Sequence, residues 1–152
     1  MIATTGVAVT IHACSPQSVR AVFRILVRHG LTENIDAATA KFDVLTLDES
    51  KWGFELECGS AMKIANELMI EAPDVIFTAF EEPAEGHQGT VCMYVPELGP
   101  FRSACDADGE PLLKQKLLLA MEGETAEVRR RFLGVPWVTA IAALPGGLVR
   151  AA

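Results

Sequence analysis

The fold is decided by Val7-Ala8-Val9-Thr10-Ile11-His12, a stretch in which apolar residues alternate with small or polar ones. A two-residue period is typical of a strand with one face in the core, so a strand is expected over residues 6–14. Ser15 and Pro16 follow as an N-cap and a first-turn proline. Apolar residues at helical spacing then predict a helix over residues 16–29.

Two further strands are expected downstream, over residues 42–47 and 52–58, with a hairpin connection at residues 48–51. Ser60 is a candidate cap for a second helix, which Pro73 ends. The apolar alternation then resumes and predicts a fourth strand next to that proline.

The fourth strand covers residues 75–80, which completes the order strand, helix, strand, strand, helix, strand. This order predicts an α+β fold with a ferredoxin-like βαββαβ sandwich over residues 6–82. Right-handed crossovers put both helices on the same face of the sheet and leave its other face open.

The remainder of the single domain, residues 87–144, is predicted to be a β-hairpin followed by helices. These elements, or a second chain, are expected to cover the open face. Thr125 can cap one of the helices. The apolar run Trp137–Leu144 is too short to distinguish helix from strand by period, and it is a candidate surface for a homodimer.

Charge is distributed unevenly along the 152 residues, whose net charge is −7. All twenty carboxylates lie between Glu33 and Glu127, where the net charge is −14, and both ends of the chain are basic. An acidic protein repels phosphates, which disfavours a general nucleic-acid binder and favours a partner with a basic surface.

No signal-peptide pattern or membrane-length apolar run is present, so a cytoplasmic protein with reduced thiols and no membrane contact is expected. The four cysteines form no C-x-x-C pair, and no metal site or cofactor is predicted from their spacing.

Several short motifs together resemble the YubB-type ferredoxin-like domain of plasmid-borne proteins. They are Lys51-Trp52, Glu71-Ala72-Pro73-Asp74-Val75, Phe80-Glu81-Glu82-Pro83, Gly86-His87-Gln88-Gly89 and Asp108-Gly109-Glu110. The resemblance covers residues 51–110, without the Gly-Thr that precedes the Lys-Trp pair in that family and without its second tryptophan. It implies the fold and a plasmid or other mobile element as the setting, but no activity.

Cys14 is the best candidate for a reactive thiol. It precedes the first helix, whose amino terminus would lower a thiol pKa, and His12 lies on the same strand face. The alternative is that this cysteine packs at the end of a buried strand.

Two charged groups are candidate protein-binding surfaces. The first is acidic and contains Glu81, Glu82 and Glu85, for which the alternative is a solvated loop. The second is the arginine row of the first helix, Arg20, Arg24 and Arg28, whose spacing of four places them on one face. The alternative for this row is a solvated face or salt bridges within the chain.

These observations favour a non-catalytic protein-binding accessory protein of a mobile element. An acidic inhibitor of a host defence system, of the anti-CRISPR or anti-restriction type, is one such protein. A small-ligand-binding regulatory domain is the alternative, on fold analogy alone. An enzyme that uses Cys14 is a third hypothesis.

Overall fold

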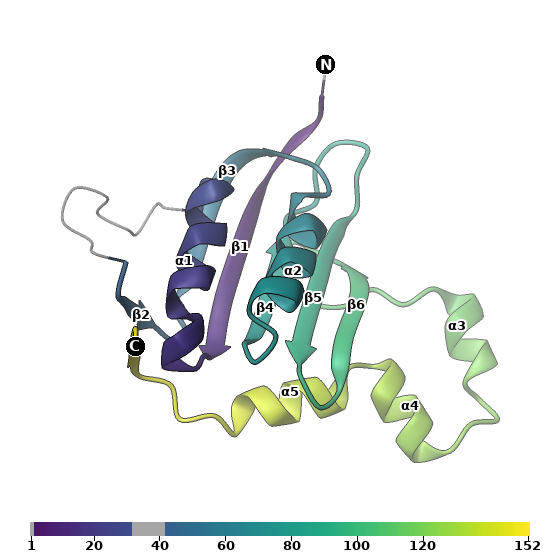
Figure 1. Cartoon of the computed structure of the whole chain (residues 1–152). Helices are drawn as coiled ribbons and strands as arrows, with labels where there is room; N and C mark the ends of the chain where they lie inside the picture. Colours follow the sequence, from purple (N-terminus) through teal and green to yellow (C-terminus); the bar gives the residue numbers. More distant parts are fainter. Residues whose placement is uncertain (1, 32–41) are drawn as a thin grey trace.

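The computed structural model describes residues 2–31 and 42–152. The main sheet has five antiparallel strands in the order β3-β1-β4-β5-β6 (Figure 1). The strands are β1 (Thr4–Ala13), β3 (Ser50–Glu57), β4 (Ile76–Glu81), β5 (Gly89–Val95) and β6 (Gly99–Cys105). The α+β class predicted from the sequence is confirmed.

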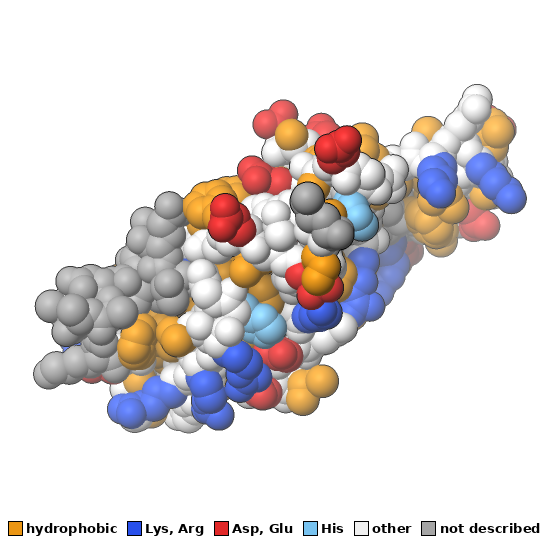
Figure 2. Space-filling view, turned by 90° about the horizontal axis from the view of Figure 1, so that it is seen from above, with side chains coloured by type: hydrophobic (Ala, Val, Ile, Leu, Met, Phe, Trp, Pro, Cys, Tyr) orange, Lys and Arg blue, Asp and Glu red, His pale blue; other side chains and the backbone are white. Residues whose placement is uncertain are grey.

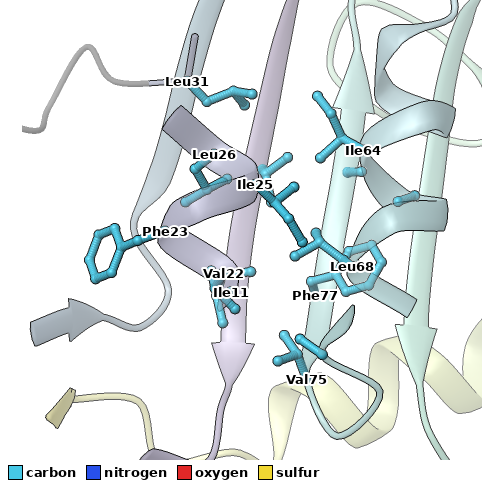
Figure 3. Close-up of a cluster of buried hydrophobic side chains, with 14 of the residues drawn as sticks. Ile11, Val22, Phe23, Ile25, Leu26, Leu31, Ile64, Leu68, Val75 and Phe77 are labelled. Carbon is cyan, nitrogen blue, oxygen red and sulfur yellow. The ribbon is translucent and has the colours of Figure 1, made fainter. Parts of the chain in front are cut away.

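Two helices lie side by side on one face of this sheet, α1 (Val19–Arg28), which follows the 3₁₀ turn η1 (Pro16–Ser18), and α2 (Ser60–Glu71) (Figure 1). Their apolar side chains meet those of β1 and β4 in the main core, where Ile11, Leu68 and Phe77 are fully buried (Figure 3). The alternation in residues 7–12 therefore produces the buried face that it predicted.

The predicted hairpin between residues 42–47 and 52–58 does not form. β2 (Val44–Thr46) pairs instead with β7 (Leu148–Arg150) in a separate two-stranded sheet. Leu45 of β2 is buried in the main core, so the short strand packs beside the sheet without joining it. The four-stranded ferredoxin-like order is therefore not confirmed.

The β5–β6 hairpin forms as predicted, but it extends the sheet beyond β4 and does not cover the open face. Part of that face is covered by α5 (Val135–Ala142), which contains most of the apolar run that could have been helix or strand. Trp137 of α5 packs with Met93, Val95 and Phe101 in a second, smaller core.

Between β6 and α5 the chain leaves the body of the molecule. Residues 112–133 contain α3 (Gln115–Ala120) and α4 (Ala126–Phe132), which project beyond the edge of the sheet (Figure 1). We call residues 112–133 the arm. Among the described helices, none has both the length and the apolarity that crossing a membrane requires.

Candidate protein-binding groove

The arm exposes an unusual amount of apolar surface. Neither α3 nor α4 has a buried residue, and within the arm Met121 is the large apolar side chain that is most deeply buried, at 6% exposed. Seven others are between 39% and 57% exposed: Leu112, Leu117, Leu118, Leu119, Val128, Phe132 and Leu133. Contiguous exposed apolar surface of this kind marks interaction sites in soluble proteins.

The local sequence explains why this surface stays exposed. Leu117, Leu118 and Leu119 are consecutive, and consecutive helical residues point about 100° apart. No single packing face can bury all three. The next helix starts at Thr125, whose hydroxyl accepts a hydrogen bond from the Val128 N–H at 3.3 Å, as the sequence predicts.

A groove separates the arm from β6, the edge strand of the sheet. It consists of two adjoining hollows of about 320 and 530 Å³, which share Phe101, Arg102 and Phe132 in their walls. The smaller hollow is lined by four consecutive β6 residues, Phe101–Ala104, and by Leu112 and Leu117 of the arm among others. The edge of the sheet therefore faces an apolar wall.

Trp137 lines the larger hollow and is held there by several contacts. Its ring lies 5.4 Å from that of Phe101, and its Nε1–H donates to the Gly99 carbonyl at 2.8 Å. The Arg131 guanidinium lies 5.0 Å from the Trp137 ring centroid and donates to the Leu98 carbonyl at 3.2 Å. Trp137 is thus anchored inside its own chain, whereas Val138 of the same run is 55% exposed, and the homodimer through Trp137–Leu144 stays a prediction.

The groove is electropositive. Arg102, Lys114 and Arg131 line it, and no carboxylate occurs among the described residues in its walls. Within residues 2–31 and 42–152, none of these three cations forms an ion pair with a carboxylate. Arg102 donates to the neutral amide oxygen of Asn66 at 2.9 Å, so its charge is not compensated there.

The predicted acidic surface is not one surface. Glu81 is 3% exposed, and its carboxylate accepts hydrogen bonds at 3.0 to 3.2 Å from the backbone N–H groups of Gly59 and Ala61. It therefore caps the amino terminus of α2 in place of Ser60, and it is not available to a partner. Glu82 is half-buried, and only Glu85 is exposed.

The arginine row lies on the exposed face of α1, as its spacing predicted. Arg20, Arg24 and Arg28 line a hollow of about 450 Å³ together with apolar residues of the same helix and Phe42. Arg28 reaches α2, where its guanidinium lies 3.1 Å from Glu67 and 3.7 Å from Glu71. Arg28 therefore forms salt bridges within the chain, which was the alternative stated for the arginine row.

Cys14 is not an activated thiol. Burial, and to a lesser degree the charge of Asp74, raises the pKa of Cys14 to about 12, whereas the sequence predicted a lowered value. His12 does not activate it either. The His12 ring hydrogen-bonds through Nδ1 to Asp48 at 2.7 Å and through Nε2 to Thr78 at 2.8 Å, which ties β1 to β4 and to the turn after β2.

Sequence reasoning did not identify the groove. The signal available was the run Leu117–Leu119 followed by the basic Arg129, Arg130 and Arg131, since consecutive leucines beside cations do not fit a solvated helix. The edge position of β6 carried no such signal, because it depends on which strands pair.

Comparison with known proteins gives a family. The family model described as "Protein of unknown function (DUF3145)" matches residues 27–142, which is more than half of the chain, and the chain belongs to this family. The matched range contains every residue that lines the groove. No curated protein and no solved structure matches the chain.

Proposed function

We propose that this member of the DUF3145 family is a non-catalytic protein-binding module whose contact surface is the arm together with the groove. The observation that carries the proposal is the exposure of seven large apolar side chains within one projecting segment of 22 residues, 112–133. Removing such surface from water stabilises a complex by roughly 25 cal/mol per Å² of apolar area.

The thiols support a non-catalytic role. Burial raises the pKa of Cys14 to about 12 and that of Cys105 to about 11, and it also raises the pKa of Cys92. A thiol nucleophile requires the opposite shift, because the thiolate is the reactive form. The hypothesis of an enzyme that uses Cys14 is therefore the least supported of the three.

The scaffold proposed for this module is a modified ferredoxin-like sandwich. Its support is the β3-β1-β4 portion of the sheet with α1 and α2 on one face. In this proposal the modification is that β2 pairs with β7 and not with the main sheet, and that the β5–β6 hairpin extends the opposite edge.

The specific form of this proposal is an inhibitor of a host defence system, encoded on a mobile element. The positive charge of the groove favours an acidic partner. The sequence, in contrast, predicted a partner with a basic surface. A small-ligand regulator stays the alternative prediction.

The proposal is tested by affinity capture from a lysate of the source cells with four forms of the full chain. They are the wild type, Leu118→Asp, Leu119→Asp and the control Ile70→Asp. Ile70 on α2 is 79% exposed, so its substitution makes the same chemical change on a surface outside the arm.

We expect one protein to be retained by the wild type and by Ile70→Asp and to be lost with either arm variant. With the purified partner, the arm variants should bind at least tenfold more weakly, equivalent to about 1.4 kcal/mol. Equal retention by all four forms would show that the arm is not the contact surface.

A further inference from the structure

We propose that the groove receives an extended, acidic segment of the partner, which pairs with β6 as a sixth strand of the main sheet. This inference rests on the proposed function and specifies the occupant of its groove. Strand addition to a sheet edge obtains affinity from backbone hydrogen bonds and specificity from pockets for alternate side chains.

The backbone of β6 offers the necessary hydrogen-bonding groups. The Leu112 N–H donates to the Ala104 carbonyl at 2.8 Å, so the backbone of Ala104 faces outward from the sheet. Backbone direction alternates along a strand, and Arg102 must therefore face outward as well. Leu112 already occupies the outward side of Ala104, so the Arg102 N–H and the Arg102 carbonyl are the groups to which a partner strand would bond.

The usable edge is short and has defined ends. Pro100 has no N–H, and an edge position is where a strand tolerates proline. At the other end the chain pairs with itself through the bridge between Cys105 and Pro111. Ala104 is bonded by Leu112, so the open edge is Phe101–Ser103, and these residues line the smaller hollow together with Ala104.

The walls of the groove suit alternate side chains of such a segment. A side chain on one face of the added strand would enter the smaller hollow between Leu112, Leu117 and Phe132. The larger hollow, with Val128 and Trp137, adjoins it along the same edge. Side chains of a strand that point to the same face lie about 6.6 Å apart, so apolar residues at alternate positions fit a wall of this kind.

The charge of the groove determines which kind of partner segment it would bind. Arg102, Lys114 and Arg131 have no carboxylate partner among the described residues, so an approaching carboxylate would gain attraction without displacing an existing ion pair. A basic segment would be repelled. We therefore expect the partner segment to alternate apolar residues with Asp or Glu.

A second copy of this chain is the competing occupant. Antiparallel pairing of two β6 strands about a two-fold axis at Arg102 would set Arg102 opposite its equivalent in the other copy, and directly opposed like charges destabilise a strand pair. A foreign acidic strand meets no such repulsion.

The test is selection of random nine-residue peptides, displayed on phage, against the immobilised full-length chain. We expect the enriched sequences to alternate apolar residues with Asp or Glu. A selected peptide should bind Lys114→Glu at least tenfold more weakly than wild type. It should bind the control Lys63→Glu, on the exposed part of α2, with unchanged affinity.

Backbone pairing is tested by N-methylation of the selected peptide at alternate residues. A strand presents every second amide to its neighbour, so one set of methylated positions should abolish binding and the other should be tolerated. Equal tolerance of both sets, enrichment of basic or helically spaced peptides, or no enrichment would each overturn strand addition. So would a dimer in light scattering that Arg102→Glu abolishes and the peptide does not disrupt.

The two proposals fail in different ways. If the captured partner depends on Leu118 and Leu119 but the peptides do not behave as strands, the protein-binding function stands and strand addition is wrong. If capture is indifferent to both leucines, the protein-binding function itself is wrong.

Discussion

At the scale of single residues, two carboxylates from β4 and its preceding turn hold the helices in place. Glu81, in the last position of β4, caps α2, and Asp74, two residues before the strand, accepts from the Ser15 N–H at 3.0 Å and from the Ser18 hydroxyl at the start of α1. Both helix amino termini, with their unpaired N–H groups and positive dipole ends, thus meet a negative charge from the same strand region.

Replacing Glu81 by alanine should lower the free energy of unfolding by about 2 to 3 kcal/mol, because the N–H groups of Gly59 and of the buried Ala61 lose a charged acceptor. Urea unfolding followed by circular dichroism measures this. The control is Glu85→Ala in the exposed turn, for which we expect a change within about 0.5 kcal/mol. Equal effects of the two substitutions would contradict the capping role.

Asp74→Asn should make a pH-dependent difference to stability. Burial raises the pKa of Asp74, but hydrogen bonds from Ser18 and Ser15 outweigh it and hold the pKa below its ordinary value. A carboxyl with a lowered folded-state pKa stabilises the fold above its unfolded pKa, about 3.9, and loses that contribution as pH falls through the folded value.

The gap in unfolding free energy between wild type and Asp74→Asn should therefore be widest at pH 7 and should close below about pH 4. Urea titrations at pH 7, 5 and 3 follow it, with Asp108→Asn in the exposed turn after β6 as the control. A gap that persists unchanged at pH 3 is incompatible with this account.

At the scale of elements, α5 differs from the arm because its Trp137 is buried in the second core, whereas the arm is exposed. Trp137 is 3% exposed and Leu118 is 47% exposed, although both lie in short apolar helices of the same region. Trp137→Ala should cost about 3 to 5 kcal/mol, and Leu118→Asp should stay within about 0.5 kcal/mol. Chemical denaturation of the two variants checks this, and a large loss with Leu118→Asp would show that the arm packs against the body.

Local patterns predicted most of these elements correctly. The alternation at residues 7–12, the helical spacing before Gly30 and the Thr125 cap each lie within one element, so their physical signals are readable in a short window. The β2–β7 pairing joins three-residue strands about a hundred residues apart, and neither strand contains a signal for the other. The groove was missed for the same reason, since it exists only once β6 is placed at an edge.

The acidic cluster was misjudged for a different reason. In sequence, Glu81 next to Glu82 and Pro83 is indistinguishable from a solvated loop. Its burial follows from the arrival of α2 beside the end of β4, which places unpaired N–H groups around the carboxylate. Tertiary structure, and not residue type, decides whether such a carboxylate is a contact or a cap.

At the scale of the whole molecule, residues 146–152 join segments that are far apart in the sequence. Gly147 accepts from the Leu47 N–H at 2.8 Å, the Ala151 N–H donates to Asp43, and the Ala152 N–H donates to Pro16 at 3.1 Å. Together with the β2–β7 pairing, these bonds close the side of the core that contains Leu45.

Removing residues 146–152 should lower the free energy of unfolding by about 2 to 4 kcal/mol, because several backbone hydrogen bonds are lost and Leu45 becomes accessible. Thermal unfolding of the shortened chain measures the effect. As a control, Leu148→Ser alters a side chain that is 70% exposed and should leave the melting temperature nearly unchanged. An unchanged melting temperature after the truncation would show that β7 is dispensable.

The arm is fastened at both ends, by the Leu112–Ala104 bond at one and by the buried Trp137 at the other. Because the body of the molecule holds both ends of the arm, neither half depends on the other for its attachment. A protease cut at Gly123, between α3 and α4, would therefore leave two pieces that stay assembled, the second held through Trp137 and β7. The nicked molecule would migrate as one particle in gel filtration and as two bands after denaturation.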